Sequence, residues 1–477
     1  MTISLAYHVA HTKCRVQGIV LGVVRVSSQL ATISSIPLED EIHAGQKDGI
    51  VPSFPLDLKP GRPSPLGSTA LGAMMLRFKL GCADEQDLFN LYSAVGLALK
   101  QETTFEMRGH QMGGDEVLFG RAGLLSAMLE IKKEASHTQQ GQSDGPGAEI
   151  SRKIAEFANN AIPKLTRTIV QAGKEGGDKM LKSAADPGSA CPISWPWIDS
   201  YYSLGAMHGI TGILAVLLDP QISTLDGEIR EYYSDIADSI SALCRVCLET
   251  NGNLPASIPP WPSDSTRSSP LVQICHGTPS LLLLLAAAAL NVDFSQQFYK
   301  SEWIDAIYSG AQRVWENGIL SKGGSLCHGI AGNAWPLLML HDCFEYGFIP
   351  LKSFDGCSEE VKATFLKEKR STGDWLLSRA VVMLQECSST RPFGTDEKYR
   401  MPDHPYSLFE GLAGTLCAWT EAILALLARI DRLDAFERGE LDFPKSSAED
   451  VKAKFVGSLR ARRGFPGIGI DFSCYEV

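Results

Sequence analysis

Several common classes of protein need features that this sequence lacks. Lysine and arginine total 44 against 55 aspartate and glutamate residues, so the net charge of −11 argues against a nucleic-acid surface, which needs clustered basic side chains. The apolar runs at 16–26 and 281–290 are shorter than the roughly 20 residues that span a bilayer. The N-terminus lacks the basic, apolar and small-residue segments of a secretory signal. Strand patterns are also scarce, so we expect a helical protein without a transmembrane segment.

The cysteines do not have the spacing of a disulfide scaffold. All 12 are scattered along 477 residues, which favours free thiols and a cytoplasmic location. Cys244 and Cys247 form a Cys-x-x-Cys pair inside a helical pattern. Because no second pair accompanies them, we interpret them as structural.

The first part of the chain differs from the rest. Residues 1–65 have no convincing helical period, and five of the residues between 51 and 65 are prolines. We therefore predict an atypical, partly disordered N-terminal arm at 1–65, followed by one helical catalytic domain at 66–477. Polar, glycine-rich stretches predict loops at 139–147 and 173–187.

A glycine pair recurs before apolar helical patterns. Gly-x-x-Gly occurs at 120–123, 209–212, 329–332 and 411–414, with more amphipathic helical patterns in between. This alternation predicts helical hairpins with an inner and an outer layer, and hence an all-α closed ring whose glycine loops converge. The alternative for any single pair is that the glycines only let two helices cross closely.

Two Cys-His-Gly triplets, at 275–277 and 327–329, suggest a metal site. Zinc binds thiolate and imidazole, and a catalytic site uses three protein ligands with a fourth position open. Cys275, Cys327 and His328 meet this requirement. His276 as a fourth ligand would instead give a closed structural site, and the residues alone leave this choice open. The simpler alternative is two buried free cysteines beside hydrogen-bonded histidines.

Further polar residues lie in equivalent loops. His208 precedes one glycine pair and could act as a general acid or base. Lys322, Arg400 and Asp403 lie in the loops before two other pairs, where cations near helix N-termini favour a ligand that carries carboxylates. The alternative for His208 is a histidine that caps its helix, and each charged residue, taken alone, is more simply interpreted as a solvated surface side chain.

The order of these motifs resembles the lanthionine synthetase C-like family, the eukaryotic relatives of the bacterial lantibiotic cyclases. The similar stretches are Gly205–Gly212, Leu271–Pro279, Lys322–Asn333, Ser407–Thr415 and Phe465–Gly467. The resemblance covers roughly residues 115–477. It implies an α/α toroid, a double-layered ring of nominally seven helical hairpins. Residues 1–65 supply no recognisable first hairpin, so that hairpin is in doubt.

The resemblance also implies a site and an activity. One Zn²⁺ would be held by Cys275, Cys327 and His328, with His208 as the acid or base. Glutathione would bind at Lys322, Arg400, Met401, Pro402 and Asp403. The implied reaction adds glutathione to dehydroalanine or dehydrobutyrine in proteins that were once phosphorylated. No secure match is found for an acidic active-site residue near Asp115 or Glu116.

Two other functions compete with this one. A non-catalytic binding or signalling protein, similar to the plant relatives proposed as abscisic acid receptors, could use the same fold. Such a binding protein would not need the three candidate metal ligands and Lys322 together. A prenyltransferase-like zinc enzyme on an α/α toroid is disfavoured by the order of the Cys-His-Gly motifs and by the lack of aromatic-rich repeats.

Overall fold

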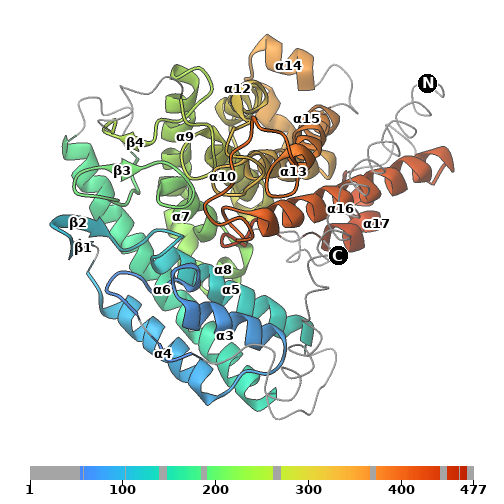
Figure 1. Ribbon diagram of the computed structural model, residues 1–477. Coiled ribbons are helices and arrows are strands. Elements are labelled where there is room, and N and C mark those ends of the chain that lie inside the picture. The colour runs from blue at the N-terminus through green and yellow to red at the C-terminus, as the bar shows by residue number, and fades with distance from the viewer. Residues whose placement is uncertain are drawn as a thin grey trace.

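The computed structural model is built almost entirely from helices (Figure 1). It describes residues 54–56, 58–102, 104–138, 148–183, 191–261, 270–365, 372–440, 448–460, 462 and 464–469. Most of the predicted arm, up to residue 53, lies outside the described residues, as do the predicted loop at 139–147 and residues 184–190. The described residues 58–65 pack on the body, where the Ser64 N–H donates to the Phe119 carbonyl oxygen at 3.0 Å.

The helices form two layers. The inner helices pack one on the next in the order α5 Arg121–Thr138, α7 Ile210–Leu217, α10 Thr278–Leu290, α13 Ile330–Glu345 and α16 Leu412–Glu437. Their hairpin partners are α6 Ala148–Ser183, α9 Tyr233–Glu249, α12 Ser301–Asn317, α15 Thr372–Glu386 and α17 Ala448–Arg460. Helices α3 Thr69–Lys79 and α4 Glu85–Lys100 pack on the first of these hairpins. The described residues thus form six hairpins, and the predicted all-α toroid is confirmed.

Short elements connect the helices. They are η1 Pro65–Gly67, α8 Pro220–Leu225, η3 Gly227–Tyr232, α11 Val292–Phe298, η5 Leu351–Phe354, α14 Glu359–Phe365 and η6 Cys387–Ser389. The described strands pair antiparallel as β1 Thr104–Met107 with β2 His110–Gly113, and β3 Tyr202–Ser203 with β4 Ser257–Ile258. Every residue of α10 is buried, because this helix is packed between α7, α12 and α13. That explains its apolar character on all faces.

The second glycine of each pair is required because the backbone of its own loop leaves no space for a Cβ atom. A Cβ on the second glycine would lie 1.9, 1.7, 1.8 or 2.0 Å from the carbonyl oxygen six residues earlier, for Gly123, Gly212, Gly332 and Gly414 respectively. No side chain fits at such distances. The same compact loop therefore precedes four of the inner helices, and the alternative of close helix crossing does not account for these glycines.

One predicted loop is wrong. The stretch 173–187 was expected to be irregular, but α6 continues to Ser183. A Cβ at Gly176 or Gly177 would lie within 2.0 Å of a carbonyl oxygen of the segment at 191–196. These glycines let that segment lie directly on the helix, so they serve packing and do not end the helix.

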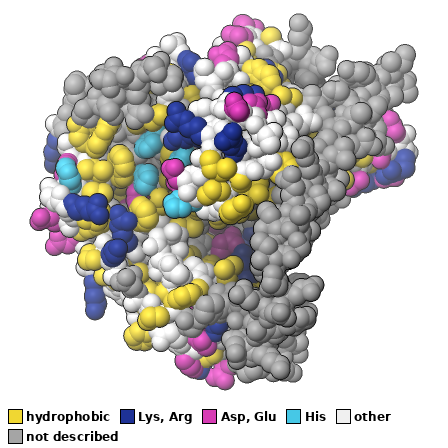
Figure 2. All heavy atoms as spheres, viewed as in Figure 1, with side chains coloured by type: hydrophobic (Ala, Val, Ile, Leu, Met, Phe, Trp, Pro, Cys, Tyr) yellow, Lys and Arg dark blue, Asp and Glu magenta, His cyan; other side chains and the backbone are white. Residues whose placement is uncertain are grey.

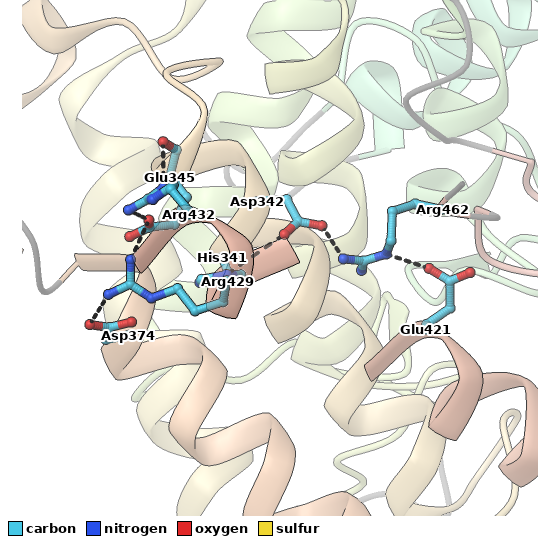
Figure 3. Close-up of polar contacts among 8 residues, drawn as sticks. All are labelled: His341, Asp342, Glu345, Asp374, Glu421, Arg429, Arg432 and Arg462. Atoms are coloured by element: carbon cyan, nitrogen blue, oxygen red, sulfur yellow. Dashed lines mark hydrogen bonds and ion pairs between the residues drawn. The ribbon is translucent and has the colours of Figure 1, made fainter. Parts of the chain in front are cut away.

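A buried group of charged side chains attaches the segment at Arg462 to the ring (Figure 3). The Arg462 guanidinium contacts Asp342 of α13 at 2.5 Å and Glu421 of α16 at 2.7 Å, and all three side chains are at most 4% exposed. Beyond it, Phe465 packs on Trp335, and residue 467 reaches Leu66 beside η1. The C-terminal segment therefore connects the last hairpin to the first described elements.

Helix α16 is long and apolar enough to cross a membrane when judged by length and composition, and the bent pair α10 and α11 passes the same test only if taken as one span. However, 56% of the apolar window of α16 is buried within the protein. Its Arg429 and Arg432 are buried and pair with Glu345. These features are those of a core helix.

Replacing Gly212 by alanine should destabilise the protein, because the new Cβ would overlap the Ala206 carbonyl oxygen. Overpacking of this kind costs about 1–3 kcal/mol. Gly96 in α4 is the matched control, since nothing lies within 4 Å of a Cβ there and alanine is the better helix former. We expect a lower thermal midpoint for Gly212→Ala and an equal or higher one for Gly96→Ala. A Gly212→Ala midpoint at or above that of wild type would contradict the loop geometry.

Burial raises the pKa of Asp342 to about 7, and Arg462 only partly offsets this. The folded protein then keeps a proton that the unfolded chain releases near pH 4, so this group's contribution to stability falls as the pH rises from about 4 to about 7. Asp342→Asn removes the titration and keeps an oxygen for Arg462. Thermal midpoints measured across this range should rise with pH for the variant relative to wild type. Parallel curves would contradict the prediction.

Candidate metal centre

The loops before the inner helices are joined by backbone hydrogen bonds. Each bond runs from an N–H in one loop to a carbonyl oxygen in the next, at 2.8–3.2 Å: Leu118 to Met207, Ala206 to Ile274, Cys275 to Cys327, and Cys327 to Phe409. As a result, residues far apart in the sequence meet at one end of the inner layer. The predicted convergence of the glycine loops is therefore present in the structure.

Cys275, Cys327 and His328 come together in these loops. Their ligand atoms all lie within 4.8 Å of one another. Cys275 is placed by a turn before α10 in which Gly277 has a φ of 126°, and the loop of Cys327 begins at Gly323 with a φ of 92°. Such backbone conformations favour glycine. Both cysteines are less than a tenth exposed, whereas the His328 side chain is 24% exposed, so the group is accessible from one side.

The donor set fits a metal ion. Two thiols and one imidazole suit zinc, and tetrahedral bonds of about 2.0–2.3 Å place neighbouring ligand atoms about 3.5–3.8 Å apart. The Cys275 Sγ and His328 Nδ1 atoms are 3.7 Å apart. Among the described residues His276 is not part of this group; its ring faces Trp197 and His208, with centroids 6.0 and 6.3 Å away. The described residues here therefore offer three ligand atoms that could hold a metal ion.

The thiols of Cys275 and Cys327 also interact directly with each other. The Cys327 thiol donates a hydrogen bond to Cys275, which lowers the pKa of Cys275 and raises that of Cys327. Gln273 Nε2 also donates to the Cys275 sulfur, at 3.2 Å. These two contacts favour the thiolate form of Cys275, the form in which cysteine binds metals.

Glu410 lies behind His328. Its Oε1 atom is 3.6 Å from His328 Nε2, and its Oε2 atom is 3.8 Å from His404 Nε2. A carboxylate beside Nε2 favours the tautomer that leaves Nδ1 free, and Nδ1 is the nitrogen next to Cys275. This histidine assignment follows from the positions of its neighbours.

His208 is paired with an acid. Its Nδ1 atom lies 2.6 Å from Glu116 Oε2. Burial disfavours the charged imidazolium, but the Glu116 carboxylate outweighs this effect and raises the pKa of His208 above its ordinary value. The ring also stacks on Trp197, with centroids 5.4 Å apart. The pair is suited to holding a proton near neutral pH.

The predicted binding residues form a rim on two neighbouring loops, one that leads to Cys327 and one that leads to Glu410. The Arg400 N–H donates to the Ser321 carbonyl oxygen at 2.8 Å, so the loop that contains Arg400 lies beside Lys322. Lys322, Arg400, Met401 and Asp403 are exposed and Pro402 is half-buried. Figure 2 shows histidine side chains on this face, with hydrophobic side chains and lysine and arginine side chains around them.

Sequence reasoning missed three residues here. The sequence assigns no role to Glu116. Its neighbour Asp115 accepts a hydrogen bond from Arg121, with Nε and Oδ1 2.6 Å apart. Glu410 was overlooked although it directly precedes a glycine of a pair, as His208 does. Arg62 lies over the Phe119 ring at 4.1 Å and lowers the pKa of His208, yet it belongs to the predicted arm.

Known proteins resemble this chain. The model of the family described as lanthionine synthetase C-like protein matches residues 82–346. The chain is 26% identical over 303 residues to Glutathione S-transferase LANCL1 of Danio rerio, covering 63% of this chain and 57% of that protein. It is 26% identical over 363 residues to LanC-like protein GCL1 of Arabidopsis thaliana, covering 75% and 66%. Less than two thirds of each relative is therefore matched.

Replacing Glu116 by glutamine should lower the pKa of His208. The negative charge that favours the imidazolium would be lost, while burial would continue to disfavour it. The measurement is an NMR titration of the histidine ring protons, with His208→Gln to assign the signal. A pKa that is unchanged or higher in Glu116→Gln would contradict the pairing.

Proposed function

This chain belongs to the lanthionine synthetase C-like family, and on that premise we propose that it is a zinc enzyme that adds the thiol of glutathione to dehydroalanine or dehydrobutyrine residues in proteins. The observation that carries the proposal is the convergence of Cys275, Cys327 and His328 at a site with one accessible side. The printed name of the fish relative supports glutathione as the thiol. We also propose a reducing compartment such as the cytoplasm, because oxidised cysteines would not bind the metal.

The three ligands would leave one position for the substrate. Zinc, when bound, supplies a positive charge that lowers the pKa of a thiol at that position, so that a thiolate is present near neutral pH. Cys275 and Cys327 provide soft ligands, and Glu410 holds the His328 imidazole in the required orientation.

The rim would bind the rest of glutathione. This tripeptide carries two carboxylates and one ammonium group. Lys322 and Arg400 supply cations for the carboxylates, and Asp403 supplies an anion that suits the ammonium group. The backbone hydrogen bond from Arg400 to Ser321 keeps the two cations on neighbouring loops.

His208 would complete the addition. The thiolate sulfur bonds to the β-carbon of the dehydroamino acid, the carbon–carbon double bond opens, and the α-carbon takes up a proton. His208 is the proposed donor of that proton, since Glu116 raises its pKa and so favours the protonated imidazole. Glutathione loses one proton and the product carbon gains one, so the reaction needs no oxidant or reductant.

The test combines metal content with thiol addition on the same samples. Wild type should hold about one zinc ion per chain and add glutathione to a dehydroalanine peptide, measured as a mass increase. Cys327→Ala should lose both, because a thiolate ligand is removed. Cys244→Ala is the matched control, since Cys244 is a buried cysteine of α9 outside the metal group.

The outcomes separate the alternatives. Zinc without thiol addition in wild type would overturn the enzyme and favour a binding role on the same fold. A folded wild type without zinc under metal-replete conditions would overturn the metal site. Equal loss in the Cys327→Ala and Cys244→Ala proteins would show that cysteine removal acts through folding instead of through the site.

A further inference from the structure

Three aromatic side chains form a continuous surface beside the site. This aromatic shelf consists of Trp197, Tyr201 and Trp261. Its ring centroids are 5.6 Å apart for Trp197 and Trp261 and 4.6 Å apart for Tyr201 and Trp261. All three residues are only half-buried. Partly exposed aromatic rings in contact with one another mark a surface suited to binding.

The shelf is held in place by backbone hydrogen bonds. Trp197 is fixed on both sides, since its carbonyl oxygen accepts from Gly113 and its N–H donates to Tyr201, both at 2.8 Å. The turn between them is joined to β2 by Asp199, whose carboxylate accepts the Gln111 N–H at 2.9 Å. The β3–β4 pairing brings the segment that leads to Trp261 beside Tyr201. The rings are thus ordered before any ligand binds.

The shelf begins at the proposed proton donor. Trp197 stacks on His208 with an interplanar angle of 29°, and its centroid is 6.0 Å from that of His276, the neighbour of Cys275. Lys322 and Arg400 lie on the loops before α13 and α16, whereas the shelf lies beside β2 and β3.

Resting on the proposed function, we propose that the aromatic shelf binds an apolar or aromatic side chain next to the dehydroamino acid of the acceptor polypeptide. The reaction has two substrates. The one with carboxylates suits the side with the cations, which leaves the aromatic side for the polypeptide. A ring or aliphatic group on the shelf would bring the neighbouring dehydroalanine to His208.

The test uses two peptides that differ at one position. Each contains dehydroalanine, preceded by phenylalanine in one and by glycine in the other. Wild type should favour the phenylalanine peptide by about three- to ten-fold in kcat/KM, the size of an aromatic pair contact. Trp261→Ala should lose this preference. Phe89→Ala is the matched control, because Phe89 is 60% exposed on α4, away from the shelf, and this variant should keep the preference.

A binding measurement separates this proposal from the reaction itself. The same peptides with alanine in place of dehydroalanine cannot react, and their affinity for the zinc-loaded protein can be measured by calorimetry. The phenylalanine peptide should bind more tightly by the same factor, and only Trp261→Ala should abolish the difference. Equal binding of both peptides to wild type, or a preference that survives in Trp261→Ala, would overturn the shelf. Preferential binding without thiol addition would instead overturn the proposed function and leave the shelf supported.

Discussion

The site depends on the hydrogen bonds that connect one glycine loop to the next. Four of the five loops donate a backbone N–H to the next loop, and the N–H of Cys327 is among these donors. Such bonds do not depend on the side chains at the positions that they join. The loops can therefore carry different functional residues while keeping the same relative positions. The glycines are what allow the loop backbones to fold this tightly before each helix.

Because the loops are joined side by side, corresponding positions in successive loops lie close together. The residue directly before the first glycine is Phe119, His208, His276, His328 or Glu410 in successive loops. Neighbouring members of this series are in contact, as in Phe119 with His208, His208 with His276, and His328 with Glu410. One of these histidines, His328, lies with Cys275 and Cys327 in a group that could hold a metal ion, and another, His208, is paired with Glu116.

The repeated features could be predicted from the sequence, and the features that depend on a single tertiary partner could not. Glycine pairs and apolar runs predicted the inner helices, and two similar triplets pointed to Cys275, Cys327 and His328. The extension of α6 could not be predicted, because the reason for its glycines is a segment that lies on them. The role of Glu116 could not be predicted either. Only the fold shows that Arg121 pairs with Asp115, whereas Glu116 pairs with His208.

An open metal site needs this degree of support from the protein. In a closed structural site four ligands and the metal hold one another in place, and the metal contributes to folding. In the site proposed here three ligands would leave the fourth position free, so the protein has to supply the geometry. The backbone bond from Cys275 to Cys327, and Glu410 behind His328, provide it. The buried pairing of Arg462 with Asp342 and Glu421 fixes α13 and α16, the helices that follow the loops of Cys327 and Glu410. The buried side chains of Arg462, Asp342 and Glu421 therefore hold α13 and α16 in place behind the glycine loops that form the site.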